Sequence, residues 1–439
     1  MVVATPVGAA IMLDGTTYDT WGAFIWGPLL LLLAYPLCRW VANKTGEPHI
    51  AGFLFGAAAL KIVVGAVTRF YMVDAVYGAG DSLRYDDAAA ELAGPFRNGI
   101  FQDLGEVTGT RFLEIVNGVV QAVIGETLVG SFLVFAAFGF VGMCLLYLAF
   151  CEARPNGSRT LYRRLLFLTP TIWFWPSSVG KEAFLILAIG AMAYGFARLL
   201  NGHVSGLILA AVGLWGTAVV RPHIALLLAL GALAALPSSM RRPSDDQRSS
   251  RPKAARLLLP LVVLAALPAL LGSVERFFDI EGLNLESANQ LRDEVTRRTS
   301  KGGSEFVAPD TSNPIGLVQG LVTVAARPFP HEADGYQVLA SLETVVLGIV
   351  AGIAVFRRRA GLLRLLGDRW VRFSLAYVLG FAWGFSAVAN FGILVRQRSL
   401  ILPFLFVLAA AAHGPRLARD PAVTGLRREG CRIEPGLRA

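Results

Sequence analysis

Charged and polar residues lie together in five short segments, and each segment borders an apolar block. Every segment carries a cation, and three of them also carry a carboxylate. The segments are GDSLRYDD (80–87), WPSSVGKE (175–182), RPH (221–223), RPFPHE (327–332) and NFGILVRQR (390–398). Cations and carboxylates gathered in one layer would bind an anion and accept a proton beside it.

The cations of these segments predict a phosphate site. Arginine presents a planar fork of donors that matches phosphate in a bidentate manner, and lysine adds a compact point charge. We expect a phosphate or pyrophosphate head group to be held by Lys181, Arg221, Arg327, Arg396 and Arg398. The substrate-binding set is completed by neighbouring residues of the same segments, namely Arg84, Tyr85, Glu182, His223 and His331.

The carboxylates supply candidates for a general base. Asp81 is the first choice and Asp86 the second, because a glycine at position 80 would let the carboxylate of Asp81 turn toward the head-group layer. Glu332 is the third choice, and it or His331 would position an acceptor. Cations for an anionic leaving group and a base for an incoming hydroxyl are the minimum requirement for glycosyl transfer from a lipid phosphate donor.

Each residue also has a purely structural interpretation. One arginine at the end of a span often anchors it at the interface, and Asp81–Asp87 would serve as a solvated turn or a helix N-cap. Lys181 and Glu182 would cap the helix that follows them, and His223 would be an interfacial histidine. Lys61 lies in the middle of an apolar block, where it would snorkel, pair with Glu343 or have a functional role.

Composition identifies the kind of protein that must position these residues. The chain has 439 residues, of which 55% are hydrophobic and 16% charged, and its mean hydropathy is +0.57. Soluble proteins carry about 25% charged residues, so a soluble multidomain enzyme is excluded. The net charge of +9 lies in short loops between apolar blocks, which favours the positive-inside rule over nucleic-acid binding.

We predict an all-α, polytopic bundle of about eleven spans in a single transmembrane domain (1–413), followed by a basic tail (414–439). The predicted spans are 22–40, 50–70, 127–150, 161–177, 182–200, 205–220, 223–239, 257–273, 337–356, 372–391 and 399–413. Pro170 and Pro176 would kink or end the fourth span, and a re-entrant hairpin is the alternative there.

Charge sets the orientation of these spans. Six segments predicted to be cytoplasmic, including the linker 240–256 and the tail, hold 25 of the 40 basic residues. The long loops 73–126 and 273–336 are predominantly acidic, so we predict them and the N-terminus outside and the tail inside. Within the loops, 109–125 predicts an interfacial helix, and 315–326 predicts a similar helix or a slightly re-entrant one. The segment 285–305 predicts a mobile insert.

Taken together, these segments resemble bacterial membrane glycosyltransferases of the GT-C superfamily and Wzy-type repeat-unit polymerases. The resemblance implies a catalytic acid in the first long external loop, which Asp81, with Asp86 or Asp87, would supply. It also implies functional arginines in external loops, similar in character to Arg221, Arg327 and Arg396. One departure is that the acidic loop follows the second predicted span, whereas GT-C proteins usually carry it after the first.

These observations predict extracytoplasmic glycosyl transfer from a polyprenyl-(pyro)phosphate-linked sugar, by a transferase or a repeat-unit polymerase of the plasma membrane. The partners would be that donor, a glycan or lipid-linked acceptor and membrane lipids, with no nucleic acid. We expect no cofactor; a divalent metal beside Asp86 and Asp87 is the alternative, and four cysteines without metal-ligand spacing suggest no zinc. The competing interpretation is a transporter or flippase of a lipid-linked or anionic solute, which would need more polar residues at mid-membrane.

Overall fold

A computed structural model shows an all-helical chain. It describes residues 18–412 except 79, 102–103, 237–252, 281, 283, 301–303, 312, 336 and 359–361. The described residues contain no β-strand, only an isolated antiparallel bridge between Glu305 and Asn390. The predicted tail (414–439) and most of the predicted linker (240–256) lie outside the described residues.

The helices follow one another through short turns, with π-helical turns interrupting the second apolar block. In chain order they are α2 (Tyr18–Trp21), α3 (Ala23–Lys44), η1 (Pro48–Ile50), α4 (Ala51–Ala59), η2 (Leu60–Gly65, π), α5 (Ala66–Tyr71), η3 (Met72–Tyr77, π), α6 (Asp81–Arg97), α7 (Gly109–Ile124), α8 (Leu128–Ala153), α9 (Arg159–Leu168), α10 (Pro170–Phe174), α11 (Lys181–Leu200), α12 (Gly206–Val220), α13 (Pro222–Ala234), α14 (Lys253–Phe278), α15 (Leu285–Thr299), α16 (Pro314–Ala326), α17 (Gln337–Arg358), α18 (Leu362–Leu365), α19 (Arg369–Phe385) and α20 (Phe391–Ala412).

Among the residues that the structure describes, six helical segments are long and apolar enough to cross a membrane: α3, Pro48–Tyr71, α8, α11, α17 and α20. They indicate an integral membrane protein. Two other predicted spans form helices that are shorter, since α12 has 15 residues and α13 has 13. At a rise of 1.5 Å per residue these helices reach about 20 Å, less than the ~30 Å hydrocarbon core. The count of eleven spans therefore remains a prediction.

The predicted fourth span (161–177) is broken in two. α9 ends at Leu168, and Pro170 begins the short helix α10 after Thr169, whose backbone is extended. The chain then turns through 175–180 and enters α11 at Lys181. Proline lacks the amide that would continue the ladder of α9, so the break falls where the sequence predicts a kink.

The centre of the molecule is built on close contacts between α8, α11 and α12. A Cβ atom on Gly190 of α11 would lie 2.5 Å from the carbonyl oxygen of Gly142 in α8. A Cβ atom on Gly195 would lie 2.6 Å from the carbonyl oxygen of Gly206 in α12. Small residues let helix backbones approach this closely, as is common between membrane helices.

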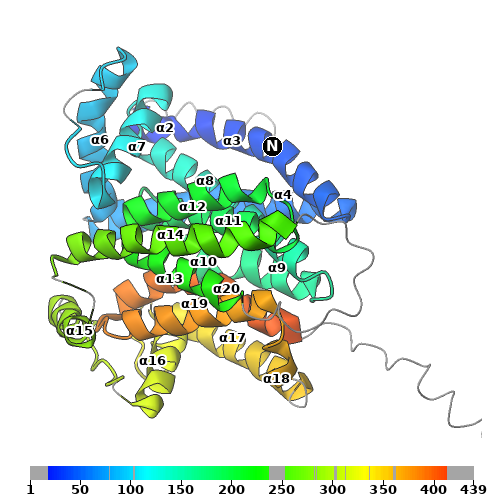
Figure 1. Cartoon of the computed structure of the whole chain (residues 1–439). Coiled ribbons are helices and arrows are strands. Elements are labelled where there is room, and N and C mark those ends of the chain that lie inside the picture. Colours follow the sequence, from blue (N-terminus) through cyan, green and yellow to red (C-terminus); the bar gives the residue numbers. More distant parts are fainter. Residues whose placement is uncertain are drawn as a thin grey trace, which may run out of the picture.

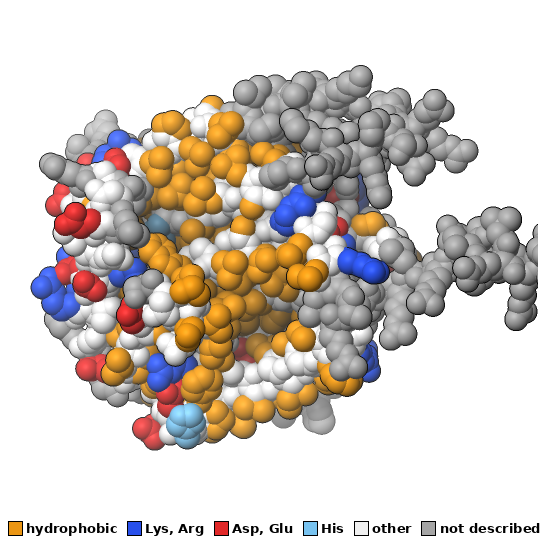
Figure 2. Space-filling model, turned by 60° about the horizontal axis from the view of Figure 1, so that its bottom comes forward, with side chains coloured by type: hydrophobic (Ala, Val, Ile, Leu, Met, Phe, Trp, Pro, Cys, Tyr) orange, Lys and Arg blue, Asp and Glu red, His pale blue; other side chains and the backbone are white. Residues whose placement is uncertain are grey.

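The helices of the two long loops lie together at one end of the bundle. Figure 1 shows α6, α7, α15 and α16 at the left, while α9 and α18 lie toward the other end. Charged side chains gather on the same side of the face seen in Figure 2, beside a broad apolar surface. We call this the polar end; the side of the membrane that it faces remains a prediction.

The segment predicted to be a mobile insert is instead a helix. α15 occupies Leu285–Thr299, and its first turn is closed by a capping box in which Asn284 and Ser287 bond each other's backbone amides. The polar composition of 285–305 suggested a loop, but Thr296 and Thr299 tie the helix to the turn after α19. Helices also form at α7 and α16, close to the two predicted interfacial segments.

Candidate functional site

The best-connected polar residue of the polar end is Glu182, in the first turn of α11. Its side chain is 5% exposed. One oxygen, Oε1, lies 3.0 Å from an Arg221 Nη2, 2.9 Å from Arg396 Nε and 3.1 Å from Gln397 Nε2. Arg221 also donates to Gln397. Two segments distant in sequence, at Arg221 and at Arg396–Gln397, thus converge on one buried carboxylate, which the positive end of the α11 dipole favours as well.

Asp81 joins this group from the rim. As the first residue of α6, it lies 3.3 Å from Arg396 Nη1 and 3.7 Å from Arg84, and its side chain is 47% exposed. Arg396 therefore links a buried carboxylate to one that reaches solvent. The backbone of Gly80 is extended, and the left-handed residue of this turn is Gly78, with φ of +60°. The conformational freedom of glycine is therefore needed at Gly78, two residues before the predicted Gly80.

Two further cations surround the same group. Lys181 is close enough for the charges of Arg221, Glu182, Asp81 and Arg396 to act on it. Arg69, in α5, is close enough for the charges of Arg396 and Glu182 to act on it. Its guanidinium lies 4.7 Å from the ring centroid of Trp175. Among the residues that the structure describes, neither Lys181 nor Arg69 forms an ion pair. We define the Glu182 cluster as Arg69, Asp81, Lys181, Glu182, Arg221, Arg396 and Gln397.

Lys61 holds the turn that leads into the cluster. Its ammonium is fully buried and donates to the carbonyl oxygens of Pro176 (2.8 Å) and Ile172 (3.2 Å) and to Ser177 Oγ (3.2 Å). These acceptors lie directly before Lys181, so Lys61 fixes the approach to α11. The predicted alternative of a pair with Glu343 is not formed, because Glu343 Oε2 accepts the amide of Thr171 at 2.7 Å.

Arg327 and Glu332 form a separate, closed pair. Arg327 Nε lies 3.1 Å from both carboxylate oxygens of Glu332, which also accepts the Phe329 amide at 3.0 Å. The guanidinium of Arg327 lies 4.5 Å from the centroid of the Phe306 ring. The hydrogen bond from Arg327 lowers the pKa of Glu332. Both charges are therefore already matched.

Arg398 belongs with this second group although it is two residues from Arg396. It is fully buried and donates to Thr344 Oγ1 at 2.8 Å and to the carbonyl oxygen of Arg327. Successive helical residues point in different directions, so α20 presents Arg396 to one group and Arg398 to the other. We define the Arg327 group as Arg327, Glu332, Thr344 and Arg398.

The remaining predicted site residues lie outside both groups. Asp86 accepts Gln121 Nε2 at 2.6 Å and Asn117 Nδ2 at 3.2 Å, so it joins α6 to α7. Tyr85 is 2% exposed, and burial raises the pKa of its hydroxyl. The ring of His223 lies among Phe277, Phe278 and Phe385, with centroids 5.3–5.8 Å away. His331 stacks on Phe329.

Sequence reasoning missed Arg69 and Gln397. Arg69 was overlooked because it lies near the end of the apolar block 50–70, where a long arginine side chain commonly reaches the interface. Gln397 was placed between two arginines and received no role of its own. In the part of the chain that the structure describes, no group of three or more His, Cys, Asp or Glu residues is arranged to hold a metal.

Comparison with known proteins adds no relative. No family model, curated protein or solved structure matches this chain.

Proposed function

We propose that this protein transfers a glycosyl group from a polyprenyl-(pyro)phosphate-linked sugar to a hydroxyl acceptor at the polar end of its bundle. The observation that carries the proposal is the charge of the Glu182 cluster. Four cations, Arg69, Lys181, Arg221 and Arg396, surround two carboxylates, Asp81 and Glu182. A surplus of two positive charges in a largely buried site calls for an anion.

A phosphate group matches the cluster better than a carboxylate would. Glu182 orients Arg221 and Arg396 through a single oxygen, and each guanidinium has five donors. Lys181 contributes a point charge beside them. Phosphate accepts bidentate bonds from arginine and can carry two charges, which would balance the surplus.

In the proposed reaction the acceptor oxygen attacks the anomeric carbon of the donor sugar. The bond between that carbon and the phosphate oxygen breaks, and a glycosidic bond forms. Asp81 takes the proton of the acceptor hydroxyl and later returns it to water, since its side chain is half-exposed. The cations of the Glu182 cluster stabilise the charge that develops on the leaving polyprenyl phosphate.

An apolar cavity of about 510 Å³ between α16, α17, α19 and α20 would suit the isoprenoid chain. Its wall includes Leu347, Ala351, Leu375 and Leu405. It begins beside Ala326 and Thr344, next to the Arg327 group. A hydrocarbon chain in this cavity would gain apolar contacts along the bundle while its head group stays at the polar end.

The test separates binding from transfer. Purified protein in lipid nanodiscs is given polyprenyl-phosphate-linked hexoses, and donor binding and product are measured independently. Arg221→Ala and Lys181→Ala should both weaken binding of polyprenyl phosphate, while Arg297→Gln, on an exposed arginine of α15, should not. Unchanged binding in both cluster variants would refute the phosphate site.

The same experiment distinguishes transport. A protein that binds the donor and moves it across a proteoliposome membrane, without forming product with any acceptor, would be a transporter of lipid-linked sugar. Among the described residues, Lys61, Glu343 and Arg398 are buried charges of the spanning helices, and each is hydrogen-bonded to the protein itself. That arrangement favours the transferase.

A further inference from the structure

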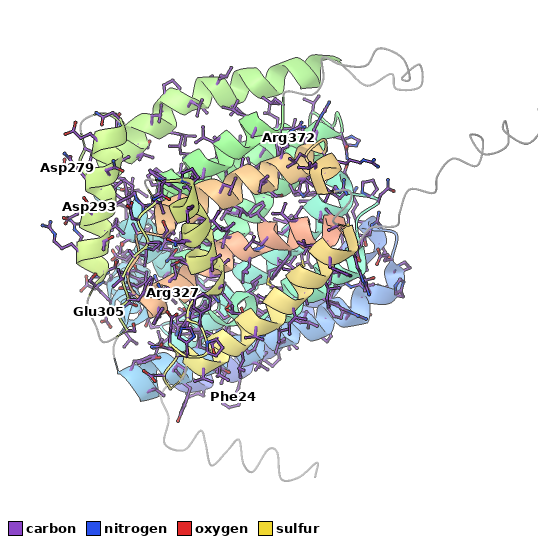
Figure 3. The ribbon with its side chains drawn as sticks, turned by 90° about the horizontal axis from the view of Figure 1, so that it is seen from below. Phe24, Asp279, Asp293, Glu305, Arg327 and Arg372 are labelled. Carbon is purple, nitrogen blue, oxygen red and sulfur yellow. The ribbon has the colours of Figure 1, made fainter. Side chains whose placement is uncertain are left out.

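A second, larger cavity lies at the polar end between α15, the extended segment 304–311 and the end of α19. Its volume is about 980 Å³. Figure 3 shows Asp293 and Glu305, two of its lining residues, at the same end of the molecule as Arg327. None of its lining residues belongs to the Glu182 cluster, so it is a separate site.

The walls of this cavity are fixed by hydrogen bonds. The amide of Phe306 donates to Ala389 at 3.1 Å, and that of Phe391 donates to Ser304 at 3.0 Å. On the opposite wall Arg292 of α15 donates to the carbonyl oxygen of Trp383 and to Ser386 Oγ. The two walls of the cavity are therefore tied to the turn between α19 and α20 by hydrogen bonds.

Its lining combines one large aromatic ring with many hydrogen-bonding groups. Trp383 is half-buried and has the guanidinium of Arg292 5.3 Å from its ring centroid. Around it are the amide of Asn289 and the carboxylates of Asp293, Glu305 and Asp310. An aromatic face packs against the C–H face of a sugar ring, and carboxylates and amides accept and donate to its hydroxyls.

The charge of the lining excludes the ligand of the other site. Three carboxylates against one arginine give a net negative cavity, which would repel a phosphate head group. A neutral, hydroxyl-rich molecule would not be repelled by these carboxylates. The volume lies at the upper end of the range for ligand pockets, about 300–1,000 Å³, which leaves room for more than one sugar ring.

We propose that this cavity binds a neutral oligosaccharide. The saccharide would be the acceptor of the proposed transfer. Only this assignment as the acceptor rests on the proposed function. Glu305, in the cavity wall, forms an isolated backbone bridge with Asn390. Arg396 lies six residues after Asn390, which corresponds to about 9 Å along the helix. An acceptor held here would extend its end toward Asp81 and the bound donor.

The test is equilibrium binding, which does not depend on transfer. Full-length protein in lipid nanodiscs, without sugar-based detergent that would compete, is titrated with four neutral probes: maltohexaose, cellohexaose, mannohexaose and chitohexaose. Saturation-transfer difference NMR and calorimetry report binding. The wild type should bind at least one probe, and failure to bind any of the four would overturn the proposal.

Variants assign the binding to this cavity. Trp383→Ala should weaken it at least about tenfold, and Trp383→Phe should restore most of it, because an aromatic face remains. Asp293→Ala alters an exposed lining residue with little risk to folding and should also weaken binding. Arg297→Gln, on the same helix but outside the lining, is the matched control. Equal binding by Trp383→Ala, Asp293→Ala and the wild type would also overturn the proposal.

The two proposals fail separately. Saccharide binding that Asp81→Asn leaves unchanged, with no transfer from any donor, would retain the cavity and refute the transferase. Transfer that proceeds with an unchanged acceptor KM in Trp383→Ala would retain the transferase and refute the cavity. A cationic peptide that displaces the probe, with binding lost at high salt, would show that the carboxylates serve a different ligand and would overturn the saccharide assignment.

Discussion

The Glu182 cluster and the Arg327 group contain the same kinds of residue and differ in how completely their charges are matched. In the cluster a single oxygen of Glu182 serves Arg221, Arg396 and Gln397, and two more cations stand nearby. In the Arg327 group one arginine meets both oxygens of one carboxylate. We propose that the first arrangement leaves positive charge for a ligand. In the second, the Arg327–Glu332 pair is closed. Among the described residues Arg398 forms no ion pair and is buried against Thr344 Oγ1 and the carbonyl oxygen of Arg327.

The difference teaches that an arginine in an external loop is evidence of a site only when its partners are known. The sequence places Arg221, Arg327, Arg396 and Arg398 in equivalent turns, and all four were predicted to hold phosphate. In the structure Arg221 and Arg396 belong to the Glu182 cluster, and Arg327 and Arg398 belong to the Arg327 group. The same residue type thus stabilises a turn in one group and is available for a ligand in the other.

The largest expected effect tests the base at the rim of the cluster. Asp81→Asn keeps the shape of the side chain and removes its proton acceptor, so transfer should fall about 100- to 10,000-fold while donor binding persists. Product formation and donor binding are measured on the same preparation. Glu91→Gln, at an exposed position of α6, is the control. Near wild-type turnover of Asp81→Asn would show that Asp81 is not the base.

The next prediction contrasts the two groups directly. Arg221→Lys retains the charge but loses the fork, so we expect donor affinity to fall about tenfold or more, equivalent to about 1.4 kcal/mol. Arg327→Lys should change donor affinity by less than about threefold, because its charge is already neutralised by Glu332. Isothermal titration with polyprenyl phosphate measures both. Equal losses would mean that the Arg327 group opens to take part in binding.

Much of this arrangement could be predicted from the sequence. Apolar blocks of spanning length predict the long helices, and the break at Pro170 follows from the missing amide of proline. Because turns on one side of a membrane share a depth, Lys181, Arg221 and Arg396 could be expected together. The contacts of Arg221 and Arg396 with Glu182, the sequence neighbour of Lys181, agree with that reasoning.

What could not be predicted is the direction of each side chain. Arg396 and Arg398 are two residues apart and reach different partners, and Asp86 turns to α7 although Asp81, five residues earlier, meets Arg396. These outcomes depend on helix phase and on neighbours distant in sequence. The helix α15 was missed for another reason, because its local signals were overlooked. Asn284 and Ser287 form a capping box, and Glu294 pairs with Arg297 and Arg298 within the helix. Bonds to the turn after α19 add to these local interactions.

A smaller effect is expected at the support of the cluster. Lys61→Met keeps an unbranched apolar stem but leaves the carbonyl oxygens of Ile172 and Pro176 without a donor. Each buried unsatisfied group costs about 1–3 kcal/mol, so the thermal midpoint should fall by several degrees and donor binding should weaken as the turn before Lys181 shifts. Thermal unfolding in nanodiscs is the measurement, with the exposed Lys44→Met as control. An unchanged midpoint together with unchanged binding would contradict this role.

The smallest effect belongs to the closed pair and concerns pH. Arg327 lowers the pKa of Glu332, so the pair stabilises the fold fully above the ordinary glutamate pKa of about 4.3 and loses that contribution as the pH falls through the lower, folded value. Glu332→Gln removes this titration.

The wild type should therefore be more heat-stable than Glu332→Gln at neutral pH, and the thermal midpoints of the two proteins should converge in acid. Glu91→Gln, at an exposed position of α6, should show no such convergence. If Glu332→Gln altered donor affinity at neutral pH and left the thermal midpoint unchanged, the closed pair would be part of the substrate site, and the distinction between the two groups would fail.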